Sequence, residues 1–256
     1  MRQTQWLIVA ALAVLHLCLP ATAAKAHKPI WAAAATPIEG HCGDVATPAQ
    51  RIRAPDGISE VEYRCINSDN NQYHLRVRAA HGPWQKLTLN PSSNPDLDLF
   101  GSDEVLWTPD SQGFFINGNE NGYTNYLLLY HRDTKGWHVY DIAAKAQRDM
   151  VRLFPPCKAF NRDDEDCKRI EKDPEFNMVG IAWTRGGRGL IVMGEVVPSS
   201  SYGGIMGAVE GYEMDVRSGE ILARYSAREL KAQWQKAMAW EMRIPEPPAY
   251  GPAQKH

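Results

Sequence analysis

The chain has 256 residues, and its 28 lysine and arginine side chains nearly balance 30 aspartate and glutamate side chains. This balance excludes the strongly basic composition of nucleic-acid-binding domains and gives no support for binding to an anionic membrane. Glycine, proline and tryptophan are plentiful while long helical patterns are few, a mixture that favours strands and turns.

Residues 1–23 have the pattern of a cleaved signal peptide. Arg2 supplies the positive charge, the run from Trp6 to Leu19 is almost wholly apolar, and Ala21-Thr22-Ala23 provides small residues for a cleavage site. The apolar run is shorter than the roughly 20 residues that span a bilayer, which makes a retained anchor the weaker alternative. We therefore expect a periplasmic or secreted protein that does not stay inserted in the membrane.

Four cysteines follow the signal, namely Cys42, Cys65, Cys157 and Cys167. An even number of cysteines in an exported chain predicts two disulfides. Of the three possible connectivities we favour the local pairs Cys42–Cys65 and Cys157–Cys167, each stabilising the fold by roughly 3 kcal/mol. A metal site is the alternative, but CxxC spacing is absent and His41 has no partner at ligand spacing. Neither a metal nor a cofactor is predicted.

The segment that follows the signal is expected to be flexible at first and ordered near its end. Residues 24–55, rich in alanine, proline and small polar side chains, are predicted to form a flexible leader that becomes ordered near Cys42. Apolar residues then alternate with polar ones over residues 73–78, as in a half-buried strand, and residues 84–89 add a further expected strand.

The most informative feature is an internal repeat within the expected domain, residues 56–244. The segment Trp107-Thr108-Pro109-Asp110-Ser111-Gln112-Gly113-Phe114-Phe115-Ile116 is echoed by Trp183-Thr184-Arg185-Gly186-Gly187-Arg188-Gly189-Leu190-Ile191-Val192. Gly118 and Gly194 lie at the same distance from the tryptophan that begins their copy. Both copies continue to a hairpin that ends in glycine, at residues 133–136 and 216–219. Each copy therefore predicts a four-stranded antiparallel sheet of about 40 residues.

These tryptophan-led segments resemble the WSPDG-type repeat of Tol-Pal-system β-propellers. The resemblance implies that the tryptophan packs between blades and that the following residues form a tight turn. Trp107-Thr108-Pro109-Asp110 matches well, whereas Arg185-Gly186 replaces the proline and aspartate in the second copy. Tyr63-Arg64-Cys65-Ile66 is a third, degenerate candidate.

The expected fold is thus mainly β, a propeller-like array of about three or more four-stranded sheets. A closed propeller usually has at least four blades, so an incomplete propeller and a β-sandwich stay open as alternatives. A helix and a cysteine-bracketed loop are predicted as an insertion at residues 143–175.

A second helix is predicted over residues 226–242, before a proline-rich tail at 245–256. Ser226 and Glu229 have the spacing of a capping box, and Leu230 begins an apolar stripe. Packing against the sheets is the favoured role for this helix, and docking to a partner is the alternative.

Two polar loops at matching positions of the repeat are the candidate binding site. The candidate residues in them are Asn119, Glu120, Asn121, Tyr123, Glu195, Ser201 and Tyr202. If the two units are neighbours, amide, hydroxyl and tyrosine groups gather on one face.

We expect a non-enzymatic protein-binding module of the cell envelope, whose partner is another envelope protein and not nucleic acid. This expectation follows from the lack of a nucleophile elbow, a P-loop or an HExxH motif, and from the repeat resemblance. One alternative is an envelope hydrolase that uses Glu195, Glu120 or His81 as acid and base. Another is an assembly factor that docks through its C-terminal helix.

Overall fold

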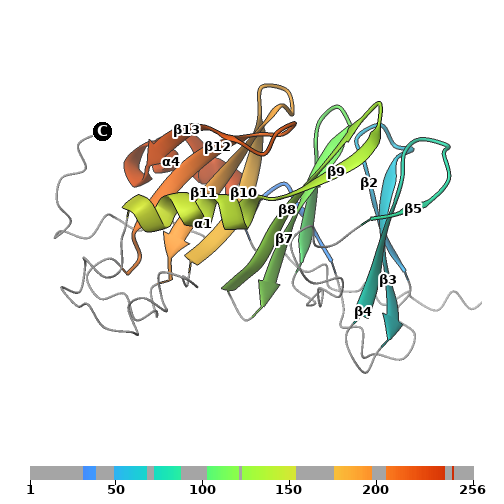
Figure 1. Ribbon diagram of the computed structural model, residues 1–256, viewed down its shortest axis with the longest axis horizontal. Coiled ribbons are helices and arrows are strands. Elements are labelled where there is room, and N and C mark those ends of the chain that lie inside the picture. Colours follow the sequence, from blue (N-terminus) through green and yellow to red (C-terminus); the bar gives the residue numbers. More distant parts are fainter. Residues whose placement is uncertain are drawn as a thin grey trace, which may run out of the picture.

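The computed structural model describes residues 31–38, 49–67, 72–87, 103–120, 123–153, 176–197, 206–239 and 244. Within these residues the chain forms three antiparallel sheets that follow one another along the long axis, with α1 and α4 at one end (Figure 1). The prediction of a mainly β, propeller-like array of three sheets is confirmed. No helix in the described ranges is long and apolar enough to cross a membrane.

The first sheet contains four strands in chain order. These are β2 (Gln50–Arg53), β3 (Glu60–Asn67), β4 (Gln72–Arg78) and β5 (Gln85–Lys86). Because side chains alternate along a strand, apolar residues such as Val61, Leu75 and Val77 lie on one face, in a core shared with the second sheet. Charged residues therefore occupy the opposite face.

The second and third sheets follow the predicted repeat. The second sheet consists of β6 (Glu104–Trp107), β7 (Gly113–Glu120), β8 (Tyr123–Asp133) and β9 (Gly136–Asp141), with β1 (Thr36–Pro37) added beside β6. The third sheet consists of β10 (Phe176–Thr184), β11 (Gly189–Val196), β12 (Val209–Asp215) and β13 (Ile221–Ser226). Gly113 and Gly189 begin the second strand of their sheets, as the repeat predicts.

The repeated tryptophans both pack against a neighbouring sheet. Trp107 is buried, and its indole Nε1 donates to the carbonyl of Ile52 in the first sheet at 3.3 Å. Trp183 is half-buried in the third sheet, and its ring centroid lies 5.2 Å from that of Phe115 in the second sheet. The predicted packing of these indoles between sheets is thus confirmed.

The repeated glycines make room for large side chains. A β-carbon at Gly118 would lie 2.1 Å from the ring of Tyr126, its cross-strand neighbour. A β-carbon at Gly194 would lie 2.8 Å from the sulfur of Met150. The shared glycine therefore lets an aromatic ring cover β7 in one unit and a helix approach β11 in the other.

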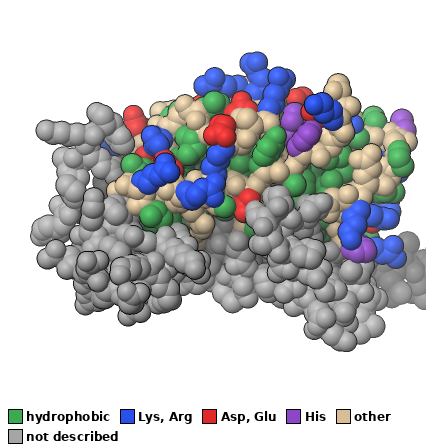
Figure 2. Space-filling model, viewed as in Figure 1, with side chains coloured by type: hydrophobic (Ala, Val, Ile, Leu, Met, Phe, Trp, Pro, Cys, Tyr) green, Lys and Arg blue, Asp and Glu red, His purple; other side chains and the backbone are tan. Residues whose placement is uncertain are grey.

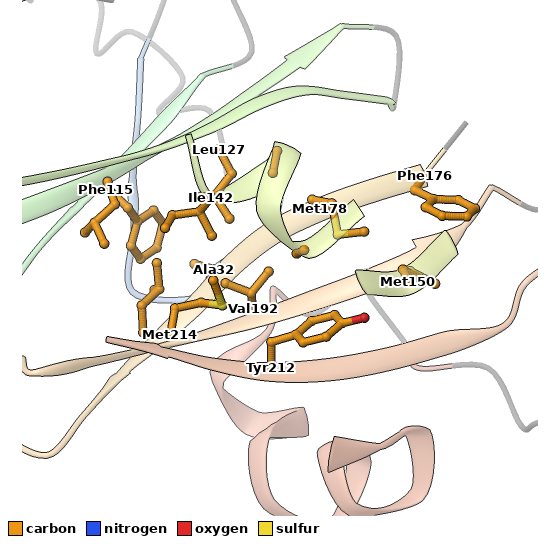
Figure 3. Packing of buried hydrophobic residues seen from close by; sticks show 14 of the residues in the cluster. Ala32, Phe115, Leu127, Ile142, Met150, Phe176, Met178, Val192, Tyr212 and Met214 are labelled. Atoms are coloured by element: carbon orange, nitrogen blue, oxygen red, sulfur yellow. The ribbon is translucent and has the colours of Figure 1, made fainter. Parts of the chain in front are cut away.

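Helix α1 (Ile142–Leu153) lies where the helical insertion was predicted. Asp141 begins it, because its carboxylate accepts a hydrogen bond from the amide of Ala144 at 2.9 Å. The buried face of α1 includes Ile142 and Met150 and packs against β8 and the third sheet (Figure 3). The rest of the predicted insertion lies outside the described residues.

Helix α4 (Ala227–Trp234) and the 3-10 turn η2 (Gln235–Ala237) follow β13 directly. The predicted capping box is confirmed: Ser226 Oγ accepts from the amide of Glu229, and Glu229 Oε2 accepts from the amide of Ser226 at 2.8 Å. Leu230 is fully buried against the third sheet, on the face opposite α1. The regular helix is shorter than the predicted 226–242.

Part of the predicted flexible leader, residues 24–55, is folded, and the prediction is wrong for residues 31–38. Trp31 and Ala32 are buried, and their amides donate to the carboxylate of Glu104 at 3.2 and 2.9 Å. The amide of Ala33 donates to the carbonyl of Ala237 at 2.8 Å, and β1 pairs with β6. This segment therefore connects the C-terminal turn with the second sheet.

Candidate functional site

The predicted loop residues of the second sheet belong to the end of a hairpin. Asn119 pairs with Thr124, and Glu120 pairs with Tyr123, in the ladder between β7 and β8. The side chains of Asn119, Glu120 and Tyr123, and all of Asn121, lie outside the described residues. Ser201 and Tyr202 of the third-sheet loop lie outside them as well.

Of the seven residues of the predicted binding site, Glu195 is the one whose side chain the structure describes. It lies in β11, is half-buried, and accepts a hydrogen bond from Asn177 Nδ2 at 3.3 Å. Burial raises the pKa of Glu195, and the bond from Asn177 lowers it in part. Its hydrogen-bond partner is thus a residue of the adjacent strand β10.

The other predicted residues are placed only in part. Cys42, Cys157 and Cys167 lie outside the described residues, as does the side chain of Cys65 in β3, so both disulfides remain predictions. His81 is exposed in the connection between β4 and β5. Within the described ranges, no three His, Cys, Asp or Glu side chains come together as a metal site.

The outward face of the first sheet has a charge pattern that the sequence analysis did not single out. Cross-strand register aligns Arg51, Glu62 and Arg76 in one row across β2, β3 and β4. The next row, two residues further along each strand, aligns Arg53, Glu60 and Arg78. We call this surface the basic face; it comprises Arg51, Arg53, Glu60, Glu62, Arg64, His74, Arg76, Arg78, Trp84 and Lys86.

Each glutamate of the basic face joins two arginines. Glu62 Oε2 accepts from Arg51 Nε at 2.9 Å, and Glu62 Oε1 accepts from Arg76 Nε at 3.0 Å. In the second row Glu60 accepts from Arg53 Nε at 3.1 Å and from Arg78 Nη2 at 2.8 Å. Each carboxylate therefore binds one arginine of β2 and one arginine of β4, and these bonds hold the arginine side chains in place across the three strands.

The glutamates lie beneath the arginines. The side chain of Glu62 is 1% exposed, while those of Arg51 and Arg53 are 54% and 72% exposed. Burial by itself would raise the pKa of Glu62, but hydrogen bonds from Arg51 and Arg76 outweigh it and lower the pKa below its ordinary value. The Glu62 carboxylate therefore stays ionised at neutral pH and is a fixed anchor for the guanidinium groups of Arg51 and Arg76.

The indole of Trp84 supports the same arginines from the side. The guanidinium carbons of Arg76 and Arg78 each lie 5.0 Å from the ring centroid, and that of Arg51 lies 5.5 Å from it. All three distances are within the range of a cation–π interaction. Trp84 thus restricts the guanidinium groups that the glutamates already hold.

The basic face carries a clear excess of positive charge. Six basic side chains (Arg51, Arg53, Arg64, Arg76, Arg78 and Lys86) stand against the two glutamates, an excess of four charges. The whole chain has a formal charge of −2, so positive charge is concentrated on this sheet. In Figure 2 one group of Lys, Arg and His side chains lies at the right-hand end of the described surface, where Figure 1 places β3 and β4, and other Lys and Arg side chains lie along the top and over the left half.

The exposed arginines keep donors that their glutamates do not use. Arg51 and Arg53 each donate to the sheet through Nε, and their terminal amino groups form no hydrogen bond with the described residues, while both side chains are largely exposed. Guanidinium groups of this kind form short, charge-assisted hydrogen bonds to carboxylates. The basic face is therefore suited to binding anionic groups without any rearrangement of its own.

No protein-family model matches the sequence, and no curated protein matches it. Among the described residues, the basic face is a surface with a defined chemical preference, for anionic groups.

Proposed function

We propose that this protein is an exported, non-enzymatic binding module whose basic face holds an acidic segment of another envelope protein. The observation that carries the proposal is the pair of Arg–Glu–Arg rows, Arg51–Glu62–Arg76 and Arg53–Glu60–Arg78. In each row the buried glutamate holds an exposed arginine of β2 in place. The signal pattern of residues 1–23 supports the location.

Preorganisation is the physical argument for binding at this face. A flexible arginine loses side-chain entropy when it binds, at a cost of roughly 0.5–1.5 kcal/mol for each side chain that is immobilised. The bonds to Glu60 and Glu62 and the contacts with Trp84 have already restricted these arginines in the free protein. More of the interaction with an acidic partner is then available as affinity, and the local excess of positive charge speeds association.

The relation to WSPDG-type propeller repeats belongs to the same proposal. Three consecutive sheets with repeated Trp107 and Trp183 between them support it. In such an array the outer face of a terminal sheet is not covered by a further sheet, which leaves it available to a partner. Fold likeness is a weak guide to function, so the chemistry of the face is the main argument.

The proposal predicts that removing Arg51 and Arg53, two exposed arginines of the basic face, weakens binding to an acidic peptide. We expect Arg51→Gln/Arg53→Gln to bind a fluorescein-labelled glutamate-rich peptide about tenfold more weakly, since the variant loses two charge-assisted contacts. Fluorescence anisotropy at several salt concentrations measures the effect. Added salt should weaken binding to the wild type more than binding to the variant.

The matched control removes two arginines elsewhere. Arg148 and Arg152 are exposed on α1, so Arg148→Gln/Arg152→Gln changes the net charge equally. We expect this control to bind the peptide as the wild type does. Equal weakening of binding in both variants would show that only net charge matters. A wild-type protein that does not bind the peptide would refute the proposal.

A further inference from the structure

The two arginine rows repeat with the period of an extended chain. Arg51 and Arg53 are separated by one residue on β2, as are Arg76 and Arg78 on β4, and all four lie on the same face. A strand rises about 3.3 Å per residue, so successive rows are roughly 6.6 Å apart. A third basic row, formed by Arg64 opposite His74, continues the series along the strands.

An extended peptide presents its own side chains with this same spacing. Side chains at alternate positions of an extended chain point to one side and are separated by the rise of two residues. Glutamates at three alternate positions therefore meet three successive rows. Adjacent glutamates cannot do so, because every second one points away from the face.

We propose that the partner segment is an extended chain with acidic residues at alternate positions, lying along the strands of the first sheet. This inference rests on the proposed function and narrows it to one arrangement of charge. The four excess positive charges of the face match a segment with three or four carboxylates. The free terminal amino groups of Arg51 and Arg53 provide the first contacts.

A comparison of peptides with one composition and different order tests the arrangement. The alternating probe is Ser-Glu-Thr-Glu-Thr-Glu-Ser, and the clustered probe is Ser-Thr-Glu-Glu-Glu-Thr-Ser, each with a fluorescein label. We expect the alternating probe to bind about fivefold more tightly, because the clustered probe loses about one charge-assisted contact of ~1 kcal/mol.

A charge-conserving variant separates geometry from charge. Arg51→Lys/Arg53→Lys keeps both positive charges but lacks the planar guanidinium and its Nε bond to the glutamates. We expect it to keep salt-dependent binding and to lose most of the preference for the alternating probe. A preference that survives unchanged in this variant would overturn the role given to the rows.

The outcomes distinguish this inference from the proposed function. If the wild type binds both probes equally and Arg51→Gln/Arg53→Gln binds neither well, the alternating arrangement is wrong while the acidic-partner proposal stands. If the wild type binds neither probe, both are wrong. Binding of a sulfated glycan in place of either peptide would also overturn both, since it would identify a different class of partner.

Discussion

Replacing Glu210 with glutamine is expected to stabilise the protein by about 3 kcal/mol above pH 7 and to leave its stability nearly unchanged at about pH 4. Glu210 lies in β12 and is fully buried, and neither carboxylate oxygen has a hydrogen-bond partner in the described structure. A buried carboxyl group without partners is costly to ionise.

The groups around Glu210 increase this cost. The pKa of Glu210 is raised to about 7, chiefly by burial; Arg224 on β13 opposes the rise, while Asp149 on α1 and Glu229 on α4 contribute to it. Arg224 is already committed to Asp149, to which its Nε donates at 2.7 Å. The hydroxyl of Tyr212, on the same strand, has no hydrogen-bond partner in the described structure and does not compensate the charge.

The sign of the pH dependence follows from these values. In the unfolded chain Glu210 ionises near its ordinary pKa of 4.5, and in the folded protein it holds its proton up to about pH 7. As pH rises from 4.5 to 7 the unfolded state gains relative stability, so the contribution of Glu210 to the folded state is lost over this window. Glu210→Gln has no proton to lose there and should lack this decline.

Urea unfolding at several pH values between about 4 and 8 measures the difference. Glu220→Gln serves as the control, because Glu220 is 65% exposed and pairs with Lys145 at the surface. This control should keep the wild-type pH dependence, since exposed ion pairs contribute little. A Glu210→Gln variant whose stability falls in parallel with the wild type would contradict the prediction.

Removing the side chain of Asn117 is expected to lower the free energy of unfolding by about 3 kcal/mol. Asn117 is fully buried in β7, and its amide joins the second sheet to the third. Nδ2 donates to the carbonyl of Gly180 at 2.8 Å and to Glu104 Oε1 at 2.7 Å, while Oδ1 accepts from the amide of Gly180 at 2.8 Å. Asn117→Ala deprives all three groups of a partner at once.

Two variants at this position separate the contributions. Asn117→Asp keeps an acceptor for the amide of Gly180 but replaces the two donor bonds with repulsion from Glu104 and from the carbonyl oxygen of Gly180, so we expect it to be at least as unstable at neutral pH. Part of its loss should be recovered in acid, where the new carboxyl group is protonated. Chemical unfolding of both variants checks this, and a loss below about 1 kcal/mol for Asn117→Ala would show that the sheets do not depend on this bridge.

The repeat could be predicted because its signals are local. Trp107, the turn after it and Gly113 occupy a few consecutive residues, and the copy at Trp183 has the same spacing. Residues 31–38 were missed because their burial depends on Glu104 and on residues 237–239, which are distant in the sequence. Nothing in the alanine-rich composition of that segment indicates those contacts.

The basic face was missed for a related reason. The alternation of Arg51 with Arg53 and of Arg76 with Arg78 is visible in the sequence, but the rows exist only through cross-strand register. Net charge averages over the whole chain and conceals a local excess. The R-x-R and E-x-E spacing of these strands is the signal that would have revealed it.

The contact between residues 31–33 and residues 237–239 has a consequence for biogenesis. These two stretches meet only after almost all of the chain has been made, because about 200 residues separate them. These contacts are thus among the last to form, and a chain that lacks its final segment leaves the amide of Ala33 and the carbonyl of Trp31 without the partners that residues 237 and 239 supply.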